Sequence, residues 1–401
     1  MTKNIEMPEQ AVILAGGKGT RLRPLTDSMP KPMIFFHGKP FLEYLIDQLR
    51  EQGFKKVLLL LGYLPHIICD YFGDGKSFGV EIDYSITDVE DETGRRVKLA
   101  AEKLDSCFLL MYCDNYWPMR MADMWEHFLN TDARCQITVY SNRDNYTKNN
   151  VLTDNKGMVA CYDKTRSAEN LNCVEIGYAI MKKEVLDFLP DENVNFEKSV
   201  YPVLTEQHKL SAYLTDHRYY SVGSHERLHL TESFLQRRPA IILDRDGVLN
   251  KKAPKASYVR NWDEFQWLPG AKEAVCLLKS AGYIVIIVTN QAGIGRGIMT
   301  ESDLSDIHTQ MKANLAENGA LVDAIYHCPH GWDEGCDCRK PEPGMLFQAQ
   351  RDFNMDLSRV FFIGDDIRDR QAGEAAGCPT LMVSSDTPLL QLVNERVLQK
   401  Q

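Results

Sequence analysis

Two stretches decide the fold: LAGGKGTRLRPLT at residues 14–26 and LDRDGVLN at residues 243–250. Each follows a short apolar strand and opens a series in which strands and helices alternate. After the first we expect a helix at 41–53 and strands at 57–61, 108–114 and 137–141. After the second we expect helices at 270–281, 301–317 and 343–353 and strands at 283–289, 322–327 and 359–364. The alternation predicts an α/β protein with two doubly wound, mostly parallel sheets.

The length of 401 residues fits two domains rather than one core. The charged segment HERLHLTESFLQRRP ends at Pro239 and is typical of a linking helix and its stop. We therefore expect a first domain at 8–225, a linker helix at 226–239 and a second domain at 240–395.

Composition excludes several classes of partner. A net charge of −10 gives no basic footprint for nucleic acid and little attraction to an anionic membrane. The longest apolar runs, VLLLL and YIVIIV, suit buried strands rather than membrane spans, and no signal segment precedes the first strand. Most of the 11 cysteines are scattered, as in a reduced protein, so we expect a cytoplasmic location. No pattern indicates an oligomeric state.

The first glycine-rich turn could hold phosphates. Gly16, Gly17 and Gly19 let the backbone approach a triphosphate closely, while Lys18 and Arg21 add positive potential. A lone turn of this kind could equally be a tight strand-to-helix connection. The whole run, together with MPKPM at 29–33, YFGDGKSFGVEIDY at 71–84 and YCDNY at 112–116, resembles the sugar-phosphate nucleotidyltransferases.

This resemblance implies a Rossmann-like domain in which a sugar 1-phosphate attacks the α-phosphorus of a nucleoside triphosphate and releases pyrophosphate. Positioning and charge neutralisation supply most of such catalysis. The implied nucleotide-binding residues are Gly16, Gly17, Gly19, Thr20 and Arg21, with Lys31 also on the triphosphate. Asp114 is expected to hold Mg²⁺. Lys164 is expected on the sugar phosphate, and Glu175 and Gly177 in the sugar pocket.

The first domain departs from the family pattern at two places. Many relatives carry an aspartate metal ligand in a D-x-G-T pattern where this chain has SVGS, beginning at Ser221. The metal could therefore be held more loosely, or the domain could be a binding module without catalysis. The loop beside the base, usually GTAGAL, reads ETGRRVKLA at 92–100, closer to the TGGR run of cytidylyltransferases. This loop therefore does not decide which nucleotide base the domain binds.

The second stretch places two carboxylates where they can face one phosphate. Asp244 and Asp246 are separated by one residue at a strand end. A calcium loop of the D-x-D-G type would need a glutamate at position 253, which is Ala253. The run instead resembles the haloacid dehalogenase (HAD) phosphatases, and Thr289 in VTNQ, Lys340 in CRKP and Asp365 in FIGDD complete the resemblance.

The HAD resemblance implies a role for each of these residues. Asp244 is the expected nucleophile, and Asp246 protonates the leaving oxygen and then activates water. Mg²⁺ would be held by Asp244, Asp365 and the backbone carbonyl of Asp246. Thr289 and Lys340 would hold the transferring oxygens. Asp366 stands where related heptose phosphatases usually have lysine.

A metal loop follows the third expected strand of the second domain, at 322–327. Cys328, His330, Cys336 and Cys338 form C-x-H-x5-C-x-C, a complete tetrahedral set for structural Zn²⁺. Reduced core cysteines are the alternative, but a loop rich in Gly and Asp could not bury them. The zinc would brace the loop that carries Lys340.

Two further stretches narrow the resemblance. NQAGIGRG at 290–297 and CRKPEPGM at 338–345 are similar to the D-glycero-D-manno-heptose 1,7-bisphosphate 7-phosphatases. This implies that Asn290, Gln291, Arg296 and Arg339 contact the sugar phosphate. Histidinol phosphatases share the zinc loop but usually have NQDG.

The two activities fit one another, because removal of a 7-phosphate leaves a sugar 1-phosphate, the substrate class of the first domain. We expect a bifunctional enzyme that makes a nucleotide-activated heptose, GDP-linked, for lipopolysaccharide or capsule. Its ligands would be nucleoside triphosphate, sugar phosphates, Mg²⁺ and Zn²⁺. The alternatives are cytidylyl transfer to another phosphorylated sugar or polyol, and a first domain that only binds.

Overall fold

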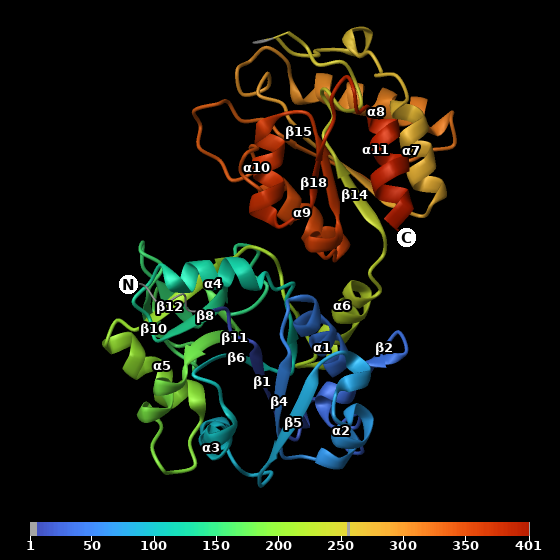
Figure 1. Cartoon of the computed structure of the whole chain (residues 1–401). Helices are drawn as coiled ribbons and strands as arrows, with labels where there is room; N and C mark the ends of the chain where they lie inside the picture. The colour runs from blue at the N-terminus through green and yellow to red at the C-terminus, as the bar shows by residue number, and fades with distance from the viewer. Residues whose placement is uncertain (1–5, 255–256, 401) are drawn as a thin grey trace. The chain divides into compact units, whose positions relative to one another are not determined.

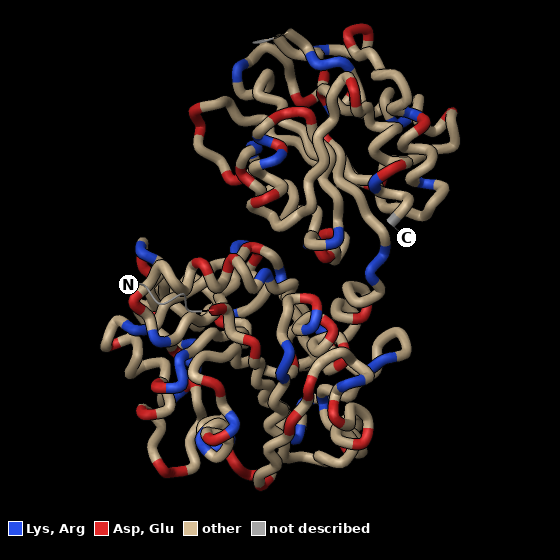
Figure 2. Tube along the Cα trace, viewed as in Figure 1, with Lys and Arg blue, Asp and Glu red and all other residues tan. Residues whose placement is uncertain are grey.

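The computed structural model describes residues 6–254 and 257–400, and the chain divides into two compact units between Leu235 and Gln236 (Figure 1). Each unit has its own sheet, with hydrophobic clusters on both faces. Acidic and basic residues are interspersed along both units (Figure 2).

The first unit is built on a seven-stranded sheet in the order β12-β8-β11-β6-β1-β4-β5. Its strands are β1 (Gln10–Ala15), β4 (Lys56–Leu61), β5 (Glu81–Ile86), β6 (Cys107–Tyr112), β8 (Cys135–Tyr140), β11 (Val174–Lys182) and β12 (Leu210–Thr215). All the neighbouring pairs are parallel except those of β11, which runs antiparallel to both β6 and β8. The mostly parallel sheet is the one that the sequence predicts.

Helices cover both faces of this sheet. One face carries α1 (Phe41–Glu51), α2 (Pro65–Phe72), α4 (Met121–Leu129) and α6 (His225–Leu235), and the other carries α3 (Thr93–Leu99) and α5 (Phe196–Glu206). Alternate residues of β1 pack into opposite clusters, Ile13 on one side and Leu14 on the other. Because both faces are buried, the strand is a continuous apolar run.

The segment expected to be a linker helix belongs to the first unit. Helix α6 buries Thr231, Phe234 and Leu235, and the Phe234 ring stacks on Tyr220 with centroids 3.8 Å apart. This apolar face, which the charged residues around it obscure in the sequence, attaches α6 to the sheet. The connection to the second unit is therefore the short segment 236–239.

The second unit has a five-stranded parallel sheet in the order β16-β15-β14-β17-β18. The strands are β14 (Ala240–Leu243), β15 (Ile284–Asn290), β16 (Ala324–Cys328), β17 (Phe361–Gly364) and β18 (Thr380–Met382). Helices α7 (Ala271–Ser280), α8 (Glu301–Ala316) and α11 (Leu389–Leu392) pack on one face, and α9 (Gly344–Phe353) and α10 (Ile367–Ala376) on the other. This is the doubly wound architecture expected.

Within the described ranges, no helix combines the length and the apolar character that crossing a membrane requires.

Candidate active sites

The glycine turn of the first unit forms one wall of a cavity of about 310 Å³ at the carboxyl end of β1. Gly19 has a φ of +64°, the left-handed region that favours glycine, and its carbonyl accepts a 2.9 Å hydrogen bond from Thr26 Oγ1. Thr20 and Arg21 begin the short helix that follows. The cavity is lined by Leu14, Gly16, Gly17, Gly19, Lys31, Pro32, residues 89–93, Arg96, Tyr112, Cys113 and Asp114.

Arg96 lies against the glycine turn and was not predicted. Its guanidinium donates to the carbonyls of Leu61, at 2.8 Å, and Asp88, at 2.7 Å, among other acceptors. A Cβ on Gly16 would come within 2.4 Å of that guanidinium, and one on Gly62 within 2.5 Å. These glycines are therefore required by the buried arginine, which ties the loop after β5 to the end of β4.

Two of the predicted catalytic residues meet directly. Lys31 Nζ lies 2.6 Å from Asp114 Oδ2, and both side chains are partly buried. Burial alone would raise the pKa of Asp114, but the charges of Lys31 and Arg21 outweigh it and lower that pKa. The carboxylate therefore stays ionised, as a metal ligand must.

Ser221 lies beside Asp114, where many relatives place a second carboxylate. It sits on β13 (Tyr220–Ser221), opposite Asn115 of β7 (Asn115–Tyr116), and the next amide, Val222 N, donates to the Asp114 carbonyl at 2.9 Å. The Ser221 hydroxyl accepts from Gly223 N at 3.0 Å. It supplies no charge, so Asp114 and the oxygens of a triphosphate would share an ion, a usual arrangement for Mg²⁺.

An acidic loop faces the glycine turn. Glu90, Asp91 and Glu92 line the cavity, and Lys18 forms an ion pair with Glu90. Because carboxylates repel phosphates, this side of the cavity suits the base rather than the triphosphate.

Two neighbouring acids lie where the sequence predicts the sugar: Glu197 is buried and Glu175 is half-buried. Gly177 N donates to Glu175 Oε1 at 2.6 Å, and Gly177 itself has a φ of +87°. Burial and the neighbouring Glu197 carboxylate raise the pKa of Glu175 to about 8. Lys164 pairs with Glu197 and donates to Asn195 Oδ1 at 2.9 Å, which holds it beside these acids.

The second unit brings Asp244, Lys340 and Asp369 together at the carboxyl end of its sheet. Lys340 Nζ lies 2.7 Å from Asp244 Oδ1 and 2.7 Å from Asp369 Oδ1, and all three residues are buried. Burial would lower the pKa of Lys340, but the two carboxylates reverse this and raise it. The ammonium is therefore charged. Asp369 was not predicted.

The Asp246 carboxylate is held by donors on several sides. Arg245 Nη2 donates to both its oxygens, at 3.1 and 2.9 Å, Asn250 Nδ2 to Oδ1 at 2.9 Å, and Gln291 Nε2 to Oδ2 at 2.8 Å. Gln291 Nε2 also donates to Thr289 Oγ1 at 2.9 Å. Gln291, predicted to contact the sugar phosphate, is thus buried and directed at the Asp246 carboxylate.

The residues present fit a Mg²⁺ ion. Ligand oxygens of Asp244, Asp365 and Asp369 all lie within 4.8 Å of one another, and carboxylate oxygen is the donor that Mg²⁺ prefers. A Cβ on Gly247 would lie 2.3 Å from Asp365 Oδ2, so only glycine admits Asp365 here. Lys252 Nζ contacts Asp365 at 2.8 Å and Asp366 at 3.4 Å. Asp366 also pairs with Arg368 Nε at 2.9 Å.

A cavity of about 490 Å³ leads to Asp246. Its lining includes Arg339, Arg368, Lys252, Trp332, Tyr258, Asn290 and Gln291. Asn290 is anchored by Lys340, whose carbonyl accepts from its Nδ2 at 3.0 Å. Arg296 stacks 4.8 Å above the Trp332 ring and donates to Tyr258 Oη at 3.3 Å.

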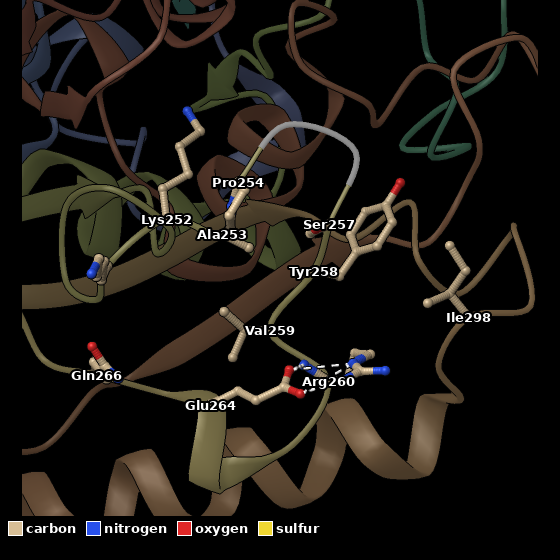
Figure 3. A pocket seen from close by; sticks show the side chains of 11 residues that line it. Lys252, Ala253, Pro254, Ser257, Tyr258, Val259, Arg260, Glu264, Gln266 and Ile298 are labelled. Atoms are coloured by element: carbon tan, nitrogen blue, oxygen red, sulfur yellow. Dashed lines mark hydrogen bonds and ion pairs between the residues drawn. The ribbon is translucent and has the colours of Figure 1, made fainter.

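A cavity of about 540 Å³ lies next to the 490 Å³ cavity (Figure 3). The two share the lining residues Lys252, Ala253, Pro254, Ser257, Tyr258 and Val259. Arg260 also lines the 540 Å³ cavity and is paired with Glu264 at 2.6 Å (Figure 3). Of these two cavities, the 490 Å³ cavity is the one that Asp246 lines.

The four predicted zinc ligands come together. Cys328 Sγ lies 3.6 Å from Cys336 Sγ and 3.5 Å from His330 Nδ1, and Cys338 Sγ closes the set at 3.5 Å from Cys336 and 3.3 Å from His330. A tetrahedron with Zn–ligand bonds of 2.0–2.3 Å has edges of about 3.3–3.8 Å. The arrangement therefore fits Zn²⁺.

The two units match different groups of known proteins. Residues 10–238 match the nucleotidyl transferase family, and residues 337–391 match the HAD-hydrolase-like family. The D-glycero-β-D-manno-heptose-1,7-bisphosphate 7-phosphatase of Bordetella bronchiseptica is 44% identical over 145 residues, which cover 36% of this chain and 80% of that protein. The enzyme of the same name from Pseudomonas aeruginosa is 42% identical over 148 residues, which cover 37% of this chain and 82% of that protein. The crystal structure of HddC from Yersinia pseudotuberculosis covers 57% of this chain and 100% of that chain, with 25% identity and a TM-score of 0.49.

The chain belongs to the nucleotidyl transferase family through its first unit and to the HAD family of heptose bisphosphate phosphatases through its second. It is a bifunctional enzyme, a nucleotidyltransferase joined to a phosphomonoester hydrolase.

Proposed function

We propose that the second unit removes the 7-phosphate of D-glycero-D-manno-heptose 1,7-bisphosphate and that the first unit transfers GMP from GTP to the resulting heptose 1-phosphate. The observation that carries this proposal is the meeting of Asp244, Asp246 and Lys340 beside a cavity with three further cations, Lys252, Arg339 and Arg368. Those cations suit a substrate with a second phosphate away from the reacting one. The product is a sugar 1-phosphate, which the first unit can use.

In the phosphatase reaction, an Asp244 carboxylate oxygen attacks phosphorus and the bond to the sugar O7 breaks, while Asp246 gives that oxygen a proton. Water then attacks the aspartyl phosphate, Asp246 takes its proton, and the bond to Asp244 breaks to release phosphate. Lys340 and Thr289 hold the transferring oxygens. Mg²⁺, held by Asp244, Asp365 and the Asp246 carbonyl, would reduce the repulsion between carboxylate and phosphate.

In the transferase reaction, the sugar 1-phosphate oxygen attacks the α-phosphorus and pyrophosphate leaves. Arg21, Lys31 and the amides of Gly16, Gly17, Gly19 and Thr20 would neutralise and orient the triphosphate, with Mg²⁺ on Asp114. Lys164 would hold the sugar phosphate, and Glu175 and Gly177 would line the sugar pocket. Arg296 and Arg339 would bind the remote phosphate in the other unit, and zinc on Cys328, His330, Cys336 and Cys338 would brace the Lys340 loop.

The acidic loop supports guanine as the base. Ionised carboxylates only accept hydrogen bonds, and the Watson–Crick edge of guanine offers two adjacent N–H donors, whereas cytosine offers a single amino group. Glu90, Asp91 and Glu92 line the cavity beside the glycine turn.

The test offers GTP, ATP, CTP and UTP separately with heptose 1-phosphate and measures pyrophosphate. We expect GTP to be preferred, and Asp114→Ala or Lys164→Ala to abolish release while the phosphatase continues; exposed Lys156→Ala is the matched control. Preference for CTP would favour the cytidylyl alternative. No turnover with any base or sugar phosphate would leave the first unit as a binding module.

A second experiment tests the order of the reactions. With heptose 1,7-bisphosphate as the only sugar, nucleotide-sugar should appear after a lag, and Asp244→Asn should largely suppress it, because a second phosphate adds about two negative charges at a site whose cation, Lys164, already pairs with Glu197. A nucleotide-linked 7-phosphate formed at the normal rate by this variant would refute the order.

A further inference from the structure

Arg245, between the two catalytic aspartates, has no exposed surface at all. Its Nη2 donates to both Asp246 oxygens, and its Nη1 lies 3.2 Å from His308 Nε2 on α8. A buried guanidinium is costly unless it is paired and hydrogen-bonded. The Arg245 guanidinium is held between two partners, the Asp246 carboxylate and the His308 imidazole.

His308 can serve here only as a neutral acceptor. Arginine has no acceptor, so the proton of the His308 ring must lie on Nδ1 and the lone pair of Nε2 must face Nη1. Burial and the charge of Arg245 lower the pKa of His308 to about 3, so the ring is neutral at physiological pH. The imidazole therefore fixes the plane of the guanidinium without adding charge.

We infer that Arg245 and His308 are positioning residues, which together hold the Asp246 carboxyl group in the orientation needed to exchange a proton with the leaving oxygen. The inference rests on the proposed role of Asp246 as the acid. Asn250 and Gln291 are as buried as Arg245, but each is a neutral amide that donates to one oxygen of this carboxylate. Arg245 contacts both oxygens from a site locked by burial, so it sets the carboxylate plane.

Positioning and mere structural support predict different kinetics. General acid catalysis contributes typically 10²–10⁴-fold and needs a donor within about 2.6–3.2 Å of the leaving oxygen. A sugar alkoxide leaves poorly without a proton, whereas p-nitrophenolate leaves well without one. A misdirected Asp246 should therefore slow the sugar phosphate far more than p-nitrophenyl phosphate, and general loosening of the site should slow both alike.

The experiment compares kcat/KM of the full chain for heptose 1,7-bisphosphate and for p-nitrophenyl phosphate. We expect His308→Leu to lower the first by about 10- to 100-fold and the second less than about threefold. His308→Gln, whose amide oxygen can accept from Arg245, should restore both. His327→Leu is the matched control, since its ring lies 6.2 Å from that of His308 and its Nε2 bonds Glu301 instead.

Arg245→Lys is the second variant, because one ammonium cannot reproduce the fork between Asp246 and His308. Like His308→Leu, it should lower kcat/KM for heptose 1,7-bisphosphate far more than kcat/KM for p-nitrophenyl phosphate. This variant therefore tests the inference even if His308→Leu does not fold. Equal losses on both substrates in a folded variant, or no rescue by glutamine, would overturn the inference.

Asp246→Asn separates the two hypotheses. If this variant slows both substrates alike, Asp246 is not the acid and the proposed function is wrong on that point. If Asp246→Asn discriminates and the folded Arg245 and His308 variants do not, only the positioning role fails.

Discussion

Replacing Lys340 by methionine should destabilise the second unit strongly at neutral pH. Methionine keeps much of the volume and removes the ammonium that lies 2.7 Å from both Asp244 and Asp369. Removing one partner of a buried ion pair costs about 3–5 kcal/mol. Proton uptake limits the cost. Burial raises the pKa of Asp244 to about 7, so this carboxyl already takes up a proton near neutral pH, and binding a second proton at pH 7 to an aspartate with the ordinary pKa of 3.8 costs about 4 kcal/mol at 1.36 kcal/mol per pH unit. We therefore expect the free energy of unfolding of the second unit to fall by about 4 kcal/mol.

The same reasoning fixes the pH dependence. In the variant, a folded-state carboxyl holds a proton that the unfolded chain releases above about pH 4, so the deficit should grow from pH 4 to pH 7. Adding Asp369→Asn should recover about half of it, since this removes one charge and can keep the acceptor for Asp365 N and Asp366 N.

The assay is urea unfolding without added Mg²⁺, followed by hydrogen exchange of peptides from β14 and β17, with β1 as the internal reference. The reasoning is refuted if the variant loses less than about 1 kcal/mol at pH 7, or if the loss is the same at pH 4.

Three further predictions concern single groups. Asp244→Asn should abolish phosphate release and leave nucleotidyl transfer nearly intact, because each site lies within one unit; loss of both activities in a folded variant would contradict this. Zinc should copurify at about one equivalent per chain, and Cys336→Ser with Cys338→Ser should lower phosphatase activity; metal analysis without zinc would refute the site. The pKa of Glu175, about 8 when folded against 4.5 ordinarily, means that the folded state holds a proton which the unfolded chain releases between these values. Stability of the first unit should fall as pH rises through that window, and Glu175→Gln should flatten the slope in urea titrations.

The alternation of apolar strands with amphipathic helices was enough to predict both doubly wound sheets. It could not give the direction of β11, since VEIGYAI is an apolar run like any buried strand. Its antiparallel position between β6 and β8 depends on neighbours that are distant in sequence. Helix α6 was interpreted as a linker for a similar reason, because the partner of Phe234 is a tyrosine on a two-residue strand.

The site residues that sequence reasoning found belong to contiguous motifs, such as Asp244 with Asp246 and the four zinc ligands. Asp369 was missed because DIRDR reads as the charged start of a helix. Only the fold turns its carboxylate toward Lys340 and the amides of the preceding turn. His308 lies on an amphipathic helix, where a half-buried histidine gives no local signal.

The contact between Arg96 and two glycines makes residues that are far apart in sequence depend on one another. Neither Gly16 nor Gly62 has a positive φ, so the backbone would admit alanine at both; the guanidinium that fills the space would not. Replacement of either glycine should become tolerable only when the arginine is lost as well. In related chains the three positions should therefore change together, and alanine at position 16 would signal a loop beside the base that is anchored by some other means.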